Sequence, residues 1–241
     1  MKKCAALLNK NQIKALFVIA MIIDHIAIAF IEQNTIAYEI SRGIGRLAGP
    51  GMSYCLAEGF CNTSNIDKYT KRLGIFAIIS TPPYLLFGLF TDAVGKTKLH
   101  DIAVSLFPFL SVIYTLLMAM LFLRIYTNQH VSQAKKYALM SLTIIASYLG
   151  DWGMYGIMFV WCFYEFRNNE RIKWALYLMI STIYILNIKK WFAAGVLLFP
   201  LVILLYNGKR GRKNVISTWG FYVIYPIHFL ILVLFKTMFC K

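Results

Sequence analysis

Charged residues are scarce in this sequence, and acidic residues are scarcer still. Only 15% of the 241 residues are charged, with 10 Asp and Glu against 25 Lys and Arg. Soluble globular domains carry about 25% charged residues, so this composition argues against a soluble protein. The mean hydropathy of +0.63 and the hydrophobic content of 59% agree with that exclusion. We therefore predict an all-α integral membrane protein.

The sequence also lacks cysteine motifs and internal repeats, and no cleavable leader is predicted. The five cysteines are scattered and include no CxxC pair, so neither a metal site nor a disulfide framework is predicted. The first apolar run is too long for a signal peptide, and no small-residue cleavage site follows it. No long linker divides the chain, so residues 1–241 are predicted to form a single domain.

Long apolar segments fill most of the chain. Each needs about 20 residues to cross a hydrocarbon layer of ~30 Å, and the pattern predicts a bundle of about nine transmembrane helices. These segments are 13–31, 42–60, 73–90, 102–123, 137–150, 151–166, 172–187, 190–206 and 216–236. Prolines and clustered glycines, as in RGIGRLAGPG at 42–51, predict that several of these helices are kinked or broken.

The basic residues indicate orientation. Most of the 25 Lys and Arg fall in alternate loops that share one side of the membrane with the N-terminus. Since basic residues concentrate in cytoplasmic loops, we expect a cytoplasmic N-terminus. The net charge of +15 is then explained by this topology and by contact with anionic lipid headgroups. No nucleic-acid partner is predicted.

Two ionisable residues interrupt the first apolar segment, 13–31. Asp24 and His25 are costly inside a membrane unless each has a partner, so the pair indicates a functional site. A rise of ~1.5 Å per residue places His25 roughly 16 Å, and His228 roughly 18–22 Å, from the cytoplasmic surface. Arg46 comes to roughly 21 Å by the same rise. We expect His25, Arg46 and His228 to line one cavity, with Arg46 as the partner of Asp24.

The residues alone leave two alternatives open. In one, the buried ions form a structural network that holds helices together. In the other, they form the proton relay of a transporter, as Asp and His chains inside membranes do elsewhere. An inverted repeat would favour the transporter, and the sequence contains none.

Further polar residues extend the candidate site. Glu58 lies near the end of its segment, and Tyr225 lies one helical turn before His228, so both are candidate substrate-binding residues. The loop NGKRGRK at 207–213 is the densest basic patch, and its side chains suit either lipid headgroups or the phosphates of a cofactor.

These motifs resemble those of the TraX family of membrane acetyltransferases, whose founding member N-acetylates F-pilin. Beyond the Asp–His pair, the resemblance rests on GRLAGPGMSYCLAEGF at 45–60, KYTKRL at 68–73, NGKRG at 207–211 and FYVIYPIHFLIL at 221–232. The motifs follow the family's order over nearly the whole chain. The stretch SVIYTLLMAM at 111–120 departs from the family pattern, which leaves the nature of the acceptor open.

The resemblance implies an acetyl-CoA-dependent N- or O-acetyltransferase in a bacterial cytoplasmic membrane. The expected acceptor is an amine, such as a peptide or pilin-like N-terminus, or a hydroxyl, such as that of an envelope glycan. His25 is the expected general base beside Asp24, and Arg46 or His228 would stabilise the thioester oxyanion. The expected ligands of the CoA phosphates are four bases: Lys209, Arg210, Arg212 and Arg72. No metal is expected.

Overall fold

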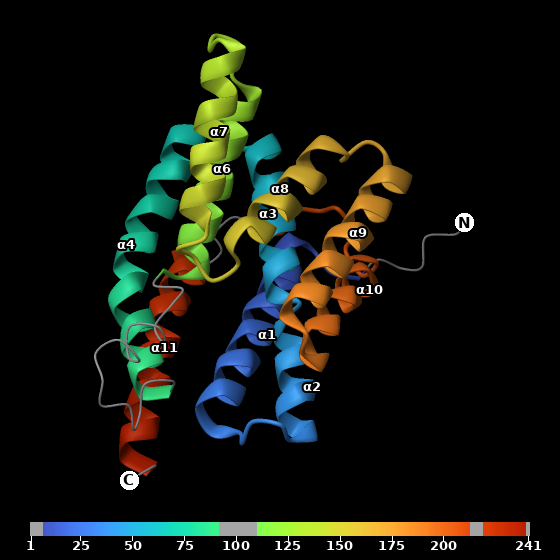
Figure 1. Ribbon diagram of the computed structural model, residues 1–241. Coiled ribbons are helices and arrows are strands. Elements are labelled where there is room, and N and C mark those ends of the chain that lie inside the picture. Colours follow the sequence, from blue (N-terminus) through green and yellow to red (C-terminus); the bar gives the residue numbers. More distant parts are fainter. Residues whose placement is uncertain (1–6, 92–109, 213–218, 240–241) are drawn as a thin grey trace. The chain divides into compact units, whose positions relative to one another are not determined.

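Helices make up nearly all of the chain that the structure describes. The computed structural model describes residues 7–91, 110–212 and 219–239 (Figure 1). Within these ranges the backbone forms helices and isolated bridges but no strand, which confirms the all-α prediction there. Residues 102–109 and 216–218 of the predicted segments, together with Lys213, lie outside the described residues.

The chain groups into two compact units, each of which we describe by itself. The first unit is Met1–Cys55 with Leu178–Lys241, and the second is Leu56–Tyr177. The first contains α1 (Lys10–Phe30), α2 (Ile36–Gly45), the 3-10 helix η1 (Trp191–Leu198), α10 (Phe199–Ile203) and α11 (Phe221–Phe239). The second contains α4 (Ile66–Thr91), α6 (Val112–Thr127), α7 (Gln133–Ser147) and α8 (Gly153–Glu165). Helices α3 (Ala48–Asn62) and α9 (Glu170–Ile188) contribute residues to both. The single domain stays a prediction.

Helices α1 and α11 pack in parallel in the first unit. At their starts, the Lys14 ammonium lies 4.9 Å from the centroid of the Phe221 ring. Near their ends, Lys236 Nζ donates to the carbonyl oxygen of Ala29 at 2.8 Å. The N-terminal ends of α1 and α11 therefore lie together, and so do their C-terminal ends. This is expected for two helices that enter a membrane from the same side.

The predicted segment 42–60 is wrong as a single helix. Helix α2 begins earlier, at Ile36, and ends at Gly45, and α3 begins at Ala48. Pro50 explains the break, because a proline ring inside a helix clashes with the carbonyl four residues earlier, here that of Arg46. In the first turn of α3 the missing N–H of Pro50 costs nothing. The predicted segment 190–206 is also divided, into η1 and α10.

Glycines let the elements of the first unit approach closely. A β-carbon on Gly45 would lie 2.3 Å from the carboxylate oxygen Oδ1 of Asp24, so only glycine fits against α1 here. A β-carbon on Gly195 would lie 1.9 Å from the carbonyl oxygen of Gly43, which brings η1 onto the backbone of α2. The glycine-rich block at 42–51 is therefore a packing surface.

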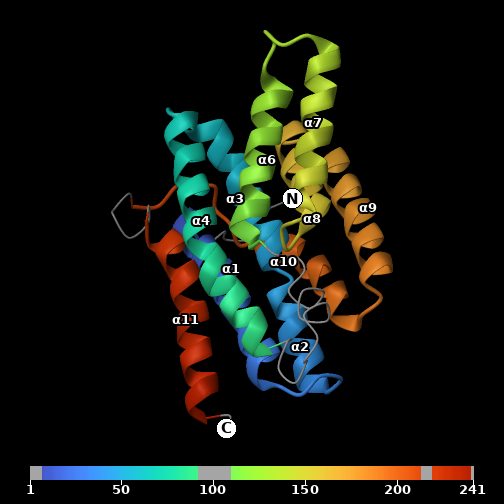
Figure 2. The same cartoon turned by 60° about the vertical axis from the view of Figure 1, so that its left-hand side comes forward.

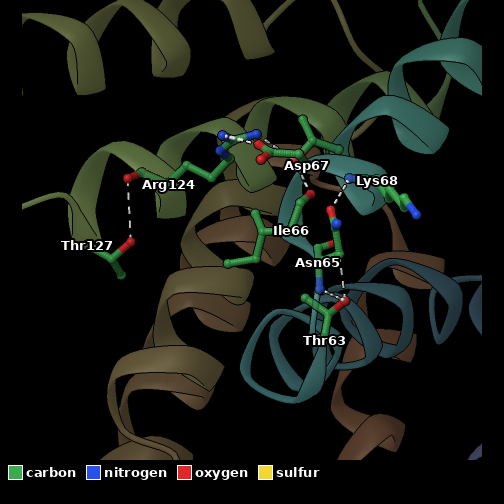
Figure 3. A network of polar contacts seen from close by, with 8 residues as sticks. Thr63, Asn65, Ile66, Asp67, Lys68, Arg124 and Thr127 are labelled. Atoms are coloured by element: carbon green, nitrogen blue, oxygen red, sulfur yellow. Dashed lines mark hydrogen bonds and ion pairs between the residues drawn. The ribbon is translucent and has the colours of Figure 1, made fainter.

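Helices α6 and α7 form an antiparallel hairpin in the second unit, as Figure 2 shows. Arg124, in the last turn of α6, donates to Asp67 Oδ1 at 2.6 Å (Figure 3). It also donates to Thr70 Oγ1 at 3.1 Å. Both acceptors lie in the first turns of α4, so this network joins the end of α6 to the start of α4. Its ion pair is exposed, with 71% of the Asp67 side chain accessible.

Three helices among the described residues are long and apolar enough to cross a membrane: Lys10–Phe30, Ile66–Thr91 and Phe221–Met238. Large apolar side chains cover their surfaces, and on α4 the side chains of Ile75, Ile78 and Ile79 are 53%, 74% and 48% exposed. Exposed apolar patches of this kind mark contact with lipid or with another protein. The number of spans beyond these three stays a prediction.

The contact between η1 and α2 is testable with a pair of glycine variants. Gly195→Ala places a methyl group against the Gly43 backbone, which cannot move aside as a side chain would. We expect a loss of about 1–3 kcal/mol of folding free energy from this overpacking. Gly74→Ala is the control, because nothing lies within 4 Å of its β-carbon position. Thermal unfolding in detergent should separate the two, and equal melting temperatures would contradict the packing.

Candidate functional site

The carboxylate of Asp24 is buried between two arginines of α2. Arg42 Nη1 and Arg46 Nη2 both donate to the same oxygen, Oδ2, each at 2.6 Å. The three side chains are only 13%, 11% and 6% exposed for Arg42, Arg46 and Asp24. Arg46 Nη1 also donates to the hydroxyl of Tyr184 at 3.2 Å. The predicted pairing of Asp24 with Arg46 is confirmed.

Arg42 is the residue that sequence reasoning missed. It lies four residues before Arg46, and residues with this spacing share one face of a helix. That spacing could have indicated Arg42 from the sequence. However, Arg42 is the first residue of the predicted segment 42–60, and a basic residue at the end of a membrane segment is usually interpreted as a charge at the membrane surface. Since α2 begins at Ile36, Arg42 lies inside the helix and reaches the same carboxylate.

The 3-10 helix η1 covers the two guanidinium groups. The Phe192 ring centroid lies 4.7 Å from the Arg42 guanidinium carbon and 5.5 Å from that of Arg46. The backbone N–H of Phe192 donates to the Glu39 carboxylate at 2.8 Å. A cation against an aromatic face is favourable and excludes water, so Phe192 both holds and shields the arginines.

His25 of α1 and His228 of α11 meet where these two helices pack together. His25 Nδ1 lies 2.8 Å from His228 Nε2, and the two ring planes are within 20° of each other, with centroids 5.0 Å apart. His25 is 7% exposed and His228 is 6% exposed. The expectation that these two histidines meet is confirmed by this contact. That the histidines and Arg46 line a common cavity stays a prediction.

Neighbours on α11 surround the histidine pair. The Phe229 ring centroid lies 4.7 Å from that of His25 and 4.0 Å from that of His228. Tyr225 is buried and meets the His228 ring edge to face at 5.4 Å. His228 Nδ1 lies 3.2 Å from the carbonyl oxygen of Ile224. The hydrogen bond between the two rings, the contact of His228 with the backbone and an aromatic wall thus all help to hold the imidazoles.

The basic loop is tied to the start of α1. The backbone N–H of Lys10 donates to the carbonyl of Lys209 at 2.9 Å, and the Asn11 side chain donates to that of Arg212 at 2.7 Å. The described part of the loop, 207–212, is therefore held by its backbone, while the side chains of Lys209, Arg210 and Arg212 are exposed. The N-terminus of α1 is closed by a capping box between Asn9 and Gln12.

Glu58 and Arg72 belong to the second unit. There the Arg72 guanidinium lies 5.6 Å from the centroid of the Tyr69 ring. The same ring fills the space beside Gly59, where a β-carbon would lie 2.9 Å from it. The structure thus gathers Gly59, Tyr69 and Arg72, three residues of the sequence motifs on α3 and α4.

Comparison with known proteins gives the family. The profile described as TraX protein matches residues 9–236. The chain belongs to the TraX family. It is also 30% identical over 233 residues to the probable fimbrial assembly protein FimC, serogroup H1, of Dichelobacter nodosus, covering 92% of this chain and 93% of that protein. No solved structure matches the chain.

The burial of Asp24 leads to a stability prediction for this family member. Asp24→Ala removes the carboxylate that faces both Arg42 and Arg46, and breaking a buried ion pair from one side costs about 3–5 kcal/mol. Asp67→Ala is the matched control, because its ion pair with Arg124 is exposed and such pairs contribute about 0–1 kcal/mol. The measurement is thermal unfolding in detergent. Similar losses for both variants would show that Asp24 does not organise the site.

Proposed function

We propose that this TraX-family protein is a membrane-bound acetyltransferase that moves an acetyl group from acetyl-CoA to an amine or hydroxyl acceptor. The observation that carries the proposal is the buried, hydrogen-bonded pair of His25 and His228. Imidazole titrates nearest to neutral pH among the side chains, which makes a buried histidine pair suited to proton transfer. Two arginines at the neighbouring Asp24 supply positive charge in the same unit.

The membrane location rests on the three long apolar helices and their exposed apolar side chains. In the proposed arrangement the basic loop and the start of α1 face the cytoplasm, where acetyl-CoA is available. The relative from Dichelobacter nodosus is named as a probable fimbrial assembly protein. That name favours a pilin-like N-terminus among the possible acceptors over an envelope glycan.

The proposed chemistry assigns one role to each group. His25 takes a proton from the acceptor while the acceptor's lone pair forms a bond to the thioester carbonyl carbon. Arg46, held by Asp24 and Tyr184, stabilises the negative charge that develops on the carbonyl oxygen. The carbon–sulfur bond then breaks, and the CoA thiolate takes up the proton. Asp24 fixes the arginine and takes no proton in this scheme.

The CoA phosphates are assigned to the basic loop. Lys209, Arg210 and Arg212 present cations from a backbone that is tied to α1. A fixed backbone lowers the entropy cost of ordering these side chains around a polyanion. The same helix, α1, carries His25, so a cofactor held at the loop has its pantetheine arm directed along the helix that bears the proposed base.

The decisive experiment incubates the purified protein in detergent with radiolabelled acetyl-CoA and a membrane extract of the host. Transfer of label to a peptide, protein or glycan supports the proposal and identifies the acceptor. Absence of any labelled product, with CoA binding measured in the same preparation, would overturn it.

The base assignment predicts that His25→Ala abolishes transfer. Losing a single acid–base group costs about 10²–10⁴-fold in rate. His130→Ala is the control, because His130 is an exposed histidine in a loop. The initial rate of label transfer is the measurement. Full activity of His25→Ala, with correct membrane insertion, would make the histidine pair a structural element.

The loop assignment predicts that Arg210→Ala weakens CoA binding. A charge-assisted phosphate contact contributes about 1.5–3 kcal/mol, so the Kd for CoA should rise by roughly 10- to 100-fold. Lys190→Ala is the control, since Lys190 is an exposed base outside the loop. Equilibrium dialysis of labelled CoA measures both. Equal Kd values for the two variants would leave the loop as a contact for lipid headgroups.

A further inference from the structure

The hydrogen bonds of the histidine pair define which ring nitrogens carry protons. A carbonyl oxygen only accepts, so the contact of His228 Nδ1 with the carbonyl of Ile224 places a proton on Nδ1. A neutral imidazole carries one N–H, so Nε2 of His228 is then an acceptor. The 2.8 Å contact to this Nε2 requires a donor, and that donor is Nδ1–H of His25. In the neutral His25 ring the remaining nitrogen, Nε2, is then unprotonated.

We propose that His228 is a positioning residue that fixes His25 in the tautomer with Nδ1 protonated and Nε2 basic. This inference rests on the proposed acetyltransferase activity for its catalytic meaning. The backbone of α11 is the fixed reference, because the Ile224 carbonyl lies in the helix that also carries His228. Orientation of a catalytic imidazole by a hydrogen bond to its second nitrogen is the general way a histidine base is held in one tautomer.

Packing supports a fixed orientation of both rings. Phe229 contacts both imidazoles, and Tyr225 closes the edge of His228. A flip of either ring would exchange a nitrogen for a carbon in the 2.8 Å contact and lose that hydrogen bond. Since a buried polar group without a partner is costly, the observed arrangement is strongly preferred.

This tautomer determines which nitrogen of His25 carries the proton during the transfer step. Nε2 of His25 accepts the proton of the acceptor's N–H or O–H as the new bond to the acetyl carbon forms. The resulting imidazolium keeps its Nδ1–H on Nε2 of His228, which stabilises the charge. The proton then leaves Nε2 for the CoA thiolate as the carbon–sulfur bond breaks. His228 uses both nitrogens in these contacts, so the oxyanion role falls to Arg46 and not to His228.

The tautomer is measurable without any activity assay. Solid-state or solution NMR of the protein labelled with ¹⁵N-histidine, in lipid nanodiscs, distinguishes a protonated ring nitrogen from an unprotonated one. Comparison with His25→Ala assigns the His25 signals. We expect a protonated Nδ1 and an unprotonated Nε2 on His25. The opposite tautomer on His25 would overturn the inference.

A pair of variants at His228 tests the positioning role in turnover. In His228→Gln the side-chain amide oxygen can reach the position of Nε2 and accept from His25, whereas His228→Phe keeps a ring and removes the acceptor. We expect His228→Phe to lower kcat by about 10²-fold or more with the KM for acetyl-CoA unchanged. His228→Gln should keep kcat at least about 10-fold higher than His228→Phe does.

The outcomes separate this inference from the proposed function. Equal kcat for the Gln and Phe variants, with both folded by thermal unfolding, would overturn the positioning role even if acetyl transfer is established. A wild-type protein that shows the expected tautomer but transfers no label supports the hydrogen-bond chain and overturns the proposed function. Rescue of turnover by Gln together with the expected tautomer supports both.

Discussion

The carboxylate of Asp24 is the constraint on which the first unit depends. An ionised carboxylate taken out of water is costly unless it is paired, and here Arg42 and Arg46 both donate to one of its oxygens. The other oxygen lies against Gly45, where no side chain fits. Helix α2 must therefore approach α1 with a glycine at the contact and arginines on either side of it.

Helix α1, held in this way, also contacts the other proposed functional groups along its length. At its start the backbone ties down the basic loop. Between its two ends His25 meets His228 of the parallel helix α11. At its end Lys236 closes the pair on the carbonyl of Ala29. A single helix thus connects a proposed cofactor loop, a proposed base and the ion cluster.

Much of this site was predictable because charge inside an apolar segment demands a partner. Asp24 required a cation, and Arg46 was the arginine placed at a similar depth by the helical rise. The depths of His25 and His228 likewise predicted their meeting. Arg42 was not predicted, because its role depends on where α2 begins. Phe192 was not predicted either, because an aromatic residue in an apolar segment gives no indication of which side chains it covers.

The sequence by itself determined the all-helical class, the family and the need for Asp24 to be paired, since composition, motif order and the cost of buried charge are local properties of the chain. Only the tertiary structure decided that two arginines share one carboxylate oxygen, that the helix breaks between Gly45 and Ala48, and that a backbone carbonyl orients the histidine pair. These features depend on how elements distant in the sequence approach one another, and hydrogen-bond geometry at 2.6–3.2 Å has no signature in residue order.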